Sequence, residues 1–86
     1  MIVKSRKEFD KKLLKLRVNE QQKVVERLKK FSQEQFFPLL NNHPLKGKYQ
    51  GYWSINITGD LRAIYKMLNA NTALFVDIDT HSNLYK

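Results

Sequence analysis

Apolar residues near the start of the chain recur at the spacing of a helix. The first stripe consists of Phe9, Leu13 and Leu16. Spacings of four and three residues place these side chains on one side of a helix. Ser5 and Glu8 have the spacing of a capping box, and the β-branched pair at positions 2–3 favours a short strand before it. We therefore predict a strand followed by a helix that ends near Arg17.

A second helical stripe consists of Val24, Val25, Leu28 and Phe31. Asn19 is a suitable cap for this helix, with Gln22 at the third helical position. Pro38 lacks an amide hydrogen and disfavours helical geometry at Phe37, so the helix cannot extend far into segment 36–40. The pattern predicts two antiparallel helices joined by a very short loop, and then a connector packed on the core.

The second half of the chain changes to the two-residue alternation of β-strands. Three runs, 52–58, 61–68 and 73–79, are separated by Gly59-Asp60 and by segment 69–72. The alternating apolar positions are Trp53, Ile55 and Ile57 in the first run and Leu74, Val76 and Ile78 in the last. These runs predict a three-stranded antiparallel meander with one apolar face and one largely polar face.

Together these elements predict an α+β fold of order β-α-α-β-β-β in a single domain, 1–86. Two N-terminal helices pack on the apolar face of an antiparallel sheet, which leaves the opposite face and the loop over 41–51 for a ligand. The side on which Arg62 lies stays open. A two-residue turn at Gly59-Asp60 places Arg62 in phase with Ile55, whereas a bulge there moves it to the polar face.

Composition narrows the class of function. The chain has 86 residues and no cysteine, so disulfides, thiolate zinc sites and cysteine nucleophiles are excluded. No apolar run approaches the roughly 18 residues of a membrane span, and we expect a cytoplasmic protein without membrane contact.

Positions 1–48 hold 13 Lys and Arg against 5 Asp and Glu, whereas positions 49–86 hold three of each. This basic half predicts a nucleic-acid partner, and the alternative is that its lysines form only a solvated surface.

Metal-free RNA cleavage requires a base for the ribose 2′-OH, an acid for the leaving 5′-oxygen and a cation for the charge on phosphate. The candidates in the second half are His43, Asp60, Arg62 and His81. Ordinary alternatives are exposed loop histidines, a turn role for Asp60, and an ion pair between Arg62 and a nearby aspartate. Tyr85 is either a ring that stacks on an RNA base or a lid over the core's edge.

The same residues argue against metal and nucleotide cofactors. The two histidines are 38 residues apart, and the three glycines are scattered. The sequence therefore predicts neither a zinc site nor a glycine-rich phosphate loop, and we expect no cofactor.

Four segments, taken in order, resemble one known family. They are 40–47 (LNNHPLKG), 49–52 (YQGY), 60–65 (DLRAIY) and 79–85 (DTHSNLY). Their order and spacing are similar to those of the RelE/ParE superfamily of bacterial toxin–antitoxin toxins, and look closest to its YafQ branch. The resemblance covers most of the chain. It implies two helices against an antiparallel sheet, in agreement with the fold predicted from the pattern.

What the resemblance implies is a ribosome-dependent endoribonuclease that cleaves messenger RNA in the decoding site and is held inactive by a cognate antitoxin. His81 and Asp60 then carry proton transfer, with the base and acid roles assignable either way. His43 matches the loop histidine of the family and assists or holds RNA.

The resemblance also implies contacts to phosphate and bases. Arg62 matches the strand arginine that RelE-type members use on the phosphate, and Tyr85 matches the terminal aromatic. We expect Lys46, Lys48 and Asn56 to bind RNA or its phosphates. The chain departs from the family at Asn56, where YafQ-like toxins often carry a histidine. Asparagine forms hydrogen bonds but does not titrate near neutrality, which leaves the identity of the base open.

Three alternative functions remain at this point. They are a ParE-like toxin that poisons DNA gyrase, a non-catalytic basic module that binds RNA or the ribosome, and a degenerate toxin retained for its antitoxin. The nuclease hypothesis requires that the two imidazoles, the carboxylate and the guanidinium converge on one concave surface.

Overall fold

One sheet of five strands organises residues 1–84, which are the residues that the computed structural model describes. Its strands are β1 (Ile2–Ser5), β2 (His43–Pro44), β3 (Trp53–Asn56), β4 (Leu61–Asn69) and β5 (Thr72–Thr80). The helices are α1 (Lys7–Lys15), α2 (Val18–Gln33) and the short α3 (His81–Leu84), with 3₁₀ turns η1 (Pro38–Leu40) and η2 (Gly47–Tyr49). The strand order across the sheet is β1-β5-β4-β3-β2.

The predicted α+β order is confirmed, but the sheet is mixed and not wholly antiparallel. Strands β3, β4 and β5 form the expected meander. Strand β1 pairs with β5 in parallel, with Ile2 opposite Thr72 and Ser5 opposite Phe75. Strand β4 runs antiparallel to both β3 and β5, so β3 and β5 run in the same direction. Strand β1 also runs in that direction and joins the sheet beside β5 as a parallel partner. A two-residue strand, β2, lies within the predicted loop and pairs with β3.

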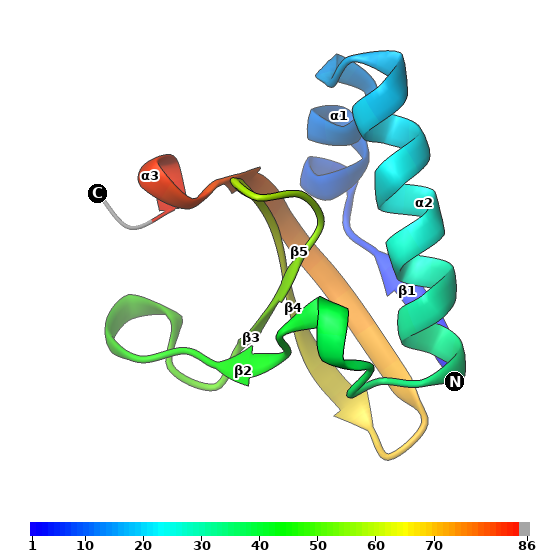
Figure 1. Cartoon of the computed structure of the whole chain (residues 1–86). Helices are drawn as coiled ribbons and strands as arrows, with labels where there is room; N and C mark the ends of the chain where they lie inside the picture. The colour runs from blue at the N-terminus through cyan, green and yellow to red at the C-terminus, as the bar shows by residue number, and fades with distance from the viewer. Residues whose placement is uncertain (85–86) are drawn as a thin grey trace.

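The two faces of the sheet are covered by different elements. Helices α1 and α2 lie on one face, whereas α3 and the segment between β2 and β3 lie on the other (Figure 1). The helix face holds the main core, and its aromatic members are Phe9, Phe31, Tyr65 and Phe75. The ring centroid of Phe31 lies 4.8 Å from that of Tyr65 and 5.2 Å from that of Phe75, both edge-on. These ring contacts join α2 to the central strands.

The predicted capping box at Ser5 and Glu8 is wrong. Ser5 is the last residue of β1, and its hydroxyl donates a hydrogen bond to Asp10 at 2.6 Å. Helix α1 therefore begins at Lys7 without a side-chain cap. Pairing with β5 extends β1 as far as Ser5, and this tertiary contact outweighs the local cap preference.

The prediction for α2 is correct in type but not in detail. The helix begins one residue before the predicted cap, Asn19, because the backbone amide of Arg17 donates to Glu20 at 3.2 Å. Val24 is fully buried as predicted, whereas Val25 is 61% exposed. Consecutive residues point about 100° apart on a helix, so the stripe that contacts the core is narrower than predicted.

A bulge makes the predicted faces of β5 correct at Ile78 but wrong at Val76. The prediction placed Leu74, Val76 and Ile78 together on the core face. The facing pairs on either side of the bulge are Tyr65 with Phe75 and Ile64 with Asp77, which leaves Val76 as the extra residue. Phe75 and Ile78 are therefore both buried against the helices, and Val76 packs on the opposite face.

Candidate active site

A second, small apolar cluster lies on the sheet face opposite α1 and α2, which we call the open face. The cluster consists of Leu45, Ile64 and Leu84. Leu45 follows β2, Ile64 lies in β4 and Leu84 ends α3, so the cluster ties three segments together. The same segments carry His43, Arg62 and His81, each two or three residues earlier in the chain.

His43 lies at the edge of the open face. It faces Ser54 of β3, which in turn faces Ile64 of β4. Facing residues of antiparallel strands project to the same side, so His43 shares a side with the small cluster. Its Nδ1 lies 2.7 Å from the carbonyl oxygen of Asn41. Because a carbonyl only accepts, Nδ1 carries the proton of the neutral ring, and Nε2 keeps a lone pair.

The loop before His43 is attached to the main core. The hydroxyl of Tyr65 donates to Oδ1 of Asn42 at 2.9 Å, and Nδ2 of Asn42 donates to the carbonyl of Gln35 at 3.1 Å. The side chain of Gln35 closes the set by donating to the Tyr65 hydroxyl at 3.2 Å. Burial raises the pKa of Tyr65, which keeps the hydroxyl protonated. These contacts fix the position at which the chain enters β2.

The turn between β3 and β4 decides the side on which Arg62 lies. Arg62 faces Asn56, so it lies on the open face and out of phase with Ile55. Its guanidinium donates to the carbonyl oxygens of Thr58 (3.0 Å), Gly59 (3.1 Å) and Leu61 (3.2 Å). Within residues 1–84 it therefore binds the turn, and the alternative of an aspartate partner is wrong.

A backbone hydrogen bond joins Asp60 and His81. The amide of His81 donates to the carbonyl oxygen of Asp60 at 2.8 Å. This bond joins the β3–β4 turn to the first residue of α3, and both side chains are exposed. The two candidates for proton transfer thus lie on neighbouring segments at one end of the sheet.

Asn56 adds unmet hydrogen-bonding capacity beside Arg62. Its Oδ1 is buried, and so is Oγ of Ser54, two residues earlier in β3; neither atom has a hydrogen-bond partner among residues 1–84. A buried acceptor without a donor costs free energy.

The predicted phosphate-binding lysines lie on the loop beyond β2. Lys46 and Lys48 are exposed, and the ammonium of Lys48 is 5.3 Å from the ring centroid of Tyr49. Tyr49 and Tyr52 pack against the small apolar cluster, which places the lysine loop beside the open face. Tyr85, the predicted stacking residue, lies outside the described residues.

The segments of His43, Arg62 and His81 thus border the open face, whereas Asn56 also lines one of two recesses beside α2. One, of about 370 Å³, runs along α2 beside η1, and one of about 430 Å³ lies between α2 and the β3–β4 turn. Lys23 and Arg27 line both recesses, and none of the four predicted catalytic residues of segment 43–81 does.

Among residues 1–84, no group of three or more His, Asp or Glu side chains is placed to hold a metal ion. Over those residues, too, every helix is too short or too polar to cross a bilayer.

Residues 1–86 match the model of the family described as the bacterial toxin of type II toxin–antitoxin system, YafQ. The chain belongs to the YafQ family. The resemblance to RelE/ParE toxins, closest to the YafQ branch, is confirmed. No curated protein sequence matches this YafQ-family chain.

Solved structures of related toxins share the fold of this YafQ-family chain. A YoeB/ParE toxin from Agrobacterium tumefaciens has a TM-score of 0.78 at 20% identity, covering 94% of this chain and 99% of that one. YafQ in the E. coli DinJ–YafQ complex has a TM-score of 0.71 at 25% identity, covering 98% and 97%. The toxin–antitoxin complex RelBE2 of Mycobacterium tuberculosis has a TM-score of 0.75 at 24% identity, covering 93% and 96%.

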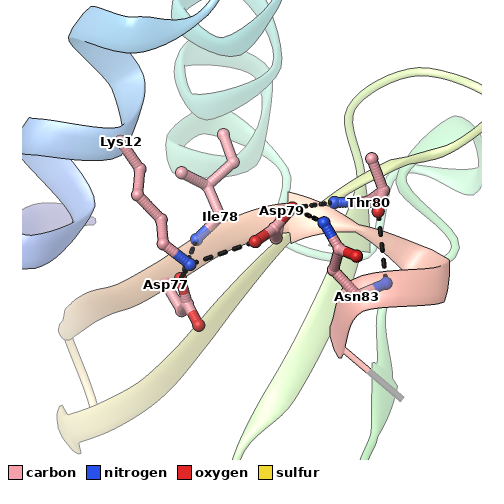
Figure 2. Close-up of polar contacts among 6 residues, drawn as sticks. All are labelled: Lys12, Asp77, Ile78, Asp79, Thr80 and Asn83. Atoms are coloured by element: carbon pink, nitrogen blue, oxygen red, sulfur yellow. Dashed lines mark hydrogen bonds and ion pairs between the residues drawn. The ribbon is translucent and has the colours of Figure 1, made fainter. Parts of the chain in front are cut away.

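One polar network of this YafQ-family toxin was not predicted. Lys12 of α1 donates to Asp77 at 2.8 Å and to Asp79 at 3.1 Å (Figure 2). The hydrogen bond to Asp77 raises the pKa of Lys12 against the opposing effect of burial. Burial works to raise the pKa of Asp79, but hydrogen bonds from Asn83, the Thr80 amide and Lys12 together lower it. The partners are 65 and 67 residues apart, so only the cap-like spacing of Thr80 and Asn83 was visible in the sequence.

Proposed function

We propose that this YafQ-family toxin is an endoribonuclease that cleaves messenger RNA on the ribosome, in the cytoplasm, and thereby inhibits translation. One observation carries the proposal: the segments of His43, Arg62 and His81 are joined by the small apolar cluster on the open face, with Asp60 bound to the backbone of His81. Two imidazoles, a carboxylate and a guanidinium can supply the base, the acid and the cation that cleavage through the ribose 2′-OH requires.

The reaction is a single displacement at phosphorus. A base takes the proton of the ribose 2′-OH, and the 2′-oxygen attacks the adjacent phosphorus. The bond from phosphorus to the 5′-oxygen breaks, and an acid protonates the 5′-oxygen. The products are a 2′,3′-cyclic phosphate and a free 5′-hydroxyl. His81 and Asp60 carry the two proton transfers, in either order. His43 assists through Nε2 or holds RNA, and Tyr85 stacks on a base.

Cations of the open face stabilise the charge that develops on the phosphate. Three hydrogen bonds from Arg62 go to carbonyls of the turn that carries Asp60, so its guanidinium positions that turn. Its remaining N–H groups are available to a phosphate oxygen. Lys46 and Lys48 add exposed positive charge on the neighbouring loop. Asn56, which faces Arg62 across the β3–β4 pair, adds a polar side chain for contact with RNA.

The basic residues of α2 supply the contact with ribosomal RNA. Lys23 and Arg27 line the recess that borders the β3–β4 turn, so RNA bound there lies beside the segment that carries Asp60. Binding through phosphates weakens steeply with salt, because each contact releases counterions. A cognate antitoxin is the second partner, since the related E. coli YafQ and M. tuberculosis RelBE2 structures are toxin–antitoxin complexes.

The test is cleavage of messenger RNA on programmed ribosomes by the wild-type chain and by His81→Ala. Loss of one proton-transfer group is expected to lower the cleavage rate by roughly 10² to 10⁴. The matched control is Ser82→Ala, which changes the next exposed residue of α3 and should cleave at the wild-type rate. Mapping the new RNA ends locates the cuts relative to codons.

Two results would count against the proposal. Undiminished cleavage by His81→Ala removes that residue from the mechanism. Growth arrest with intact transcripts and damaged gyrase function would favour the ParE-like alternative, whereas ribosome binding without cleavage would favour the non-catalytic module.

A further inference from the structure

The short helix α3 depends on contacts outside itself. It spans only His81–Leu84, which is far below the length at which a helix is stable in isolation. At its far end Leu84 is 3% exposed and packs with Leu45 and Ile64. At its start, Oγ1 of Thr80 accepts a hydrogen bond from the amide of Asn83 at 3.2 Å, as a helix cap does.

Asp79 connects this cap to the rest of the molecule. Its Oδ1 accepts from the amide of Thr80 at 2.7 Å and from Nδ2 of Asn83 at 3.0 Å. Its other oxygen, Oδ2, accepts from Lys12 of α1 at 3.1 Å. Figure 2 shows the carboxylate between the long side chain of Lys12 on one side and the turn of α3 on the other. One carboxylate therefore spans the gap between α1 and the segment that bears His81.

Asp77 provides an internal comparison. It also accepts from Lys12, at 2.8 Å, and its side chain is 25% exposed against 29% for Asp79. Its Oδ1 otherwise accepts only from the amide of Ile78 within residues 1–84. The two aspartates thus have similar burial and share one cation, but only Asp79 reaches α3.

We propose that Lys12 and Asp79 are positioning residues for His81. Lys12 holds the Asp79 carboxylate in the orientation in which its other oxygen binds Thr80 and Asn83, and this fixes the turn on which His81 stands. The proposal rests on the proposed function in one respect, namely that His81 takes part in RNA cleavage.

The geometry explains why this support is needed. The backbone of His81 is bound to the carbonyl of Asp60 on one side and enters α3 on the other, so a shift of α3 moves the imidazole relative to Asp60. Proton transfer tolerates little displacement, and a shift of about 1 Å can cost roughly 10²-fold in rate. A network that fixes the backbone of His81 therefore affects turnover more than substrate binding.

The test compares Asp79→Ala with Asp77→Ala in the full chain on programmed ribosomes. We expect Asp79→Ala to lower kcat by at least about tenfold with KM nearly unchanged, and Asp77→Ala to stay within about twofold of wild type. Lys12→Met should lower kcat in the same direction, and Lys12→Arg should restore it, because arginine keeps the charge and the donors. An equal fall in kcat in the two aspartate variants would overturn the proposal. So would a rise in KM in Asp79→Ala with kcat unchanged.

A second measurement does not depend on cleavage. In Asp79→Ala the amide of Asn83 should exchange with solvent roughly fivefold faster, and the ring resonances of His81 should shift, while Asp77→Ala changes neither. If the exchange and resonances of Asp79→Ala match wild type, the positioning role is wrong whatever the cleavage assay gives. If they change as expected but the wild-type chain does not cleave RNA, the proposed function fails and the support of α3 by Asp79 stands.

Discussion

The two faces of the sheet are built differently. The helix face buries a continuous set of large side chains, including Phe9, Phe31, Tyr65 and Phe75, all at most 1% exposed. The open face buries three aliphatic residues, surrounded by half-buried or exposed polar groups such as Asn56 and Arg62. Burial of apolar area stabilises a fold at about 25 cal/mol per Å², so most of the folding free energy comes from the helix face.

This difference separates stability from function. Unpartnered acceptors and exposed cations do not stabilise a fold, yet they are what a polar ligand needs. Changes on the helix face should therefore cause the largest losses in the free energy of unfolding, whereas changes to the polar groups of the open face should lower activity at nearly constant stability. Four predictions test this separation.

The largest effect is expected for Phe31→Ala. Phe31 is fully buried and contacts both Tyr65 and Phe75, so its loss should lower the free energy of unfolding by about 3 to 5 kcal/mol. Urea unfolding followed by circular dichroism measures it. Phe36→Ala is the matched control, because Phe36 is 60% exposed and should change stability by less than about 1 kcal/mol. A small effect at Phe31 would break the distinction between the two faces.

A smaller effect on stability but a large one on cleavage is expected for Leu84→Ala. Leu84 anchors α3 in a cluster of only three buried residues, so the cost should be about 2 kcal/mol, the lower end for leucine. Loss of this anchor also displaces His81, and the cleavage rate on programmed ribosomes should fall at a temperature where the variant remains folded. Leu68→Ala, at a residue that is 48% exposed, serves as the control. Wild-type cleavage by folded Leu84→Ala would contradict the role of the cluster.

Tyr65→Phe tests the contact between the faces. Removing the hydroxyl leaves Asn42 and Gln35 each without one partner, which should cost about 1 kcal/mol. The aromatic core should survive, while the loop before His43 loosens and its amides exchange faster. Thermal unfolding measures the loss of stability, and hydrogen exchange measures the loosening of the loop before His43. Tyr52→Phe is the control, and faster exchange in both variants would refute a specific role for Tyr65.

The smallest effect is the pH dependence of Lys12→Met. The pKa of Asp79 is lowered in the folded chain, so its ionic contribution is complete above about pH 3.9 and is lost as pH falls through the folded pKa. The pKa of Lys12 is raised, so its contribution is present below about pH 10.4 and is lost as pH rises through the folded pKa. Exposed ion pairs contribute less than about 1 kcal/mol.

Thermal unfolding across pH gives the measurement. The difference in Tm between wild type and Lys12→Met should be constant between those limits and shrink beyond each. Lys11→Met, at the exposed neighbouring position, should show no such profile. A difference that does not vary with pH would mean that Lys12 acts through packing and not through its charge.

The candidate site was predictable in its residue types and its order along the chain, but not in its contacts. The sequence allowed Arg62 on either side of the sheet, and the observed turn places it opposite Asn56. Hydrogen bonds from its guanidinium to three turn carbonyls have no signature in a linear pattern. The link between Lys12 and Asp79 joins residues 67 positions apart, which no local rule detects.

By itself, the sequence determined the element order, the α+β class, the family and the identity of the residues available for chemistry, because periodicity and turn residues are local properties. Only the tertiary structure decided the parallel pairing of β1, the bulge at Val76 and the start of α1 directly after β1. Each of these depends on which strand or helix lies alongside. Competition between a local preference and a distant partner is settled by packing, and packing exists only once the chain has folded.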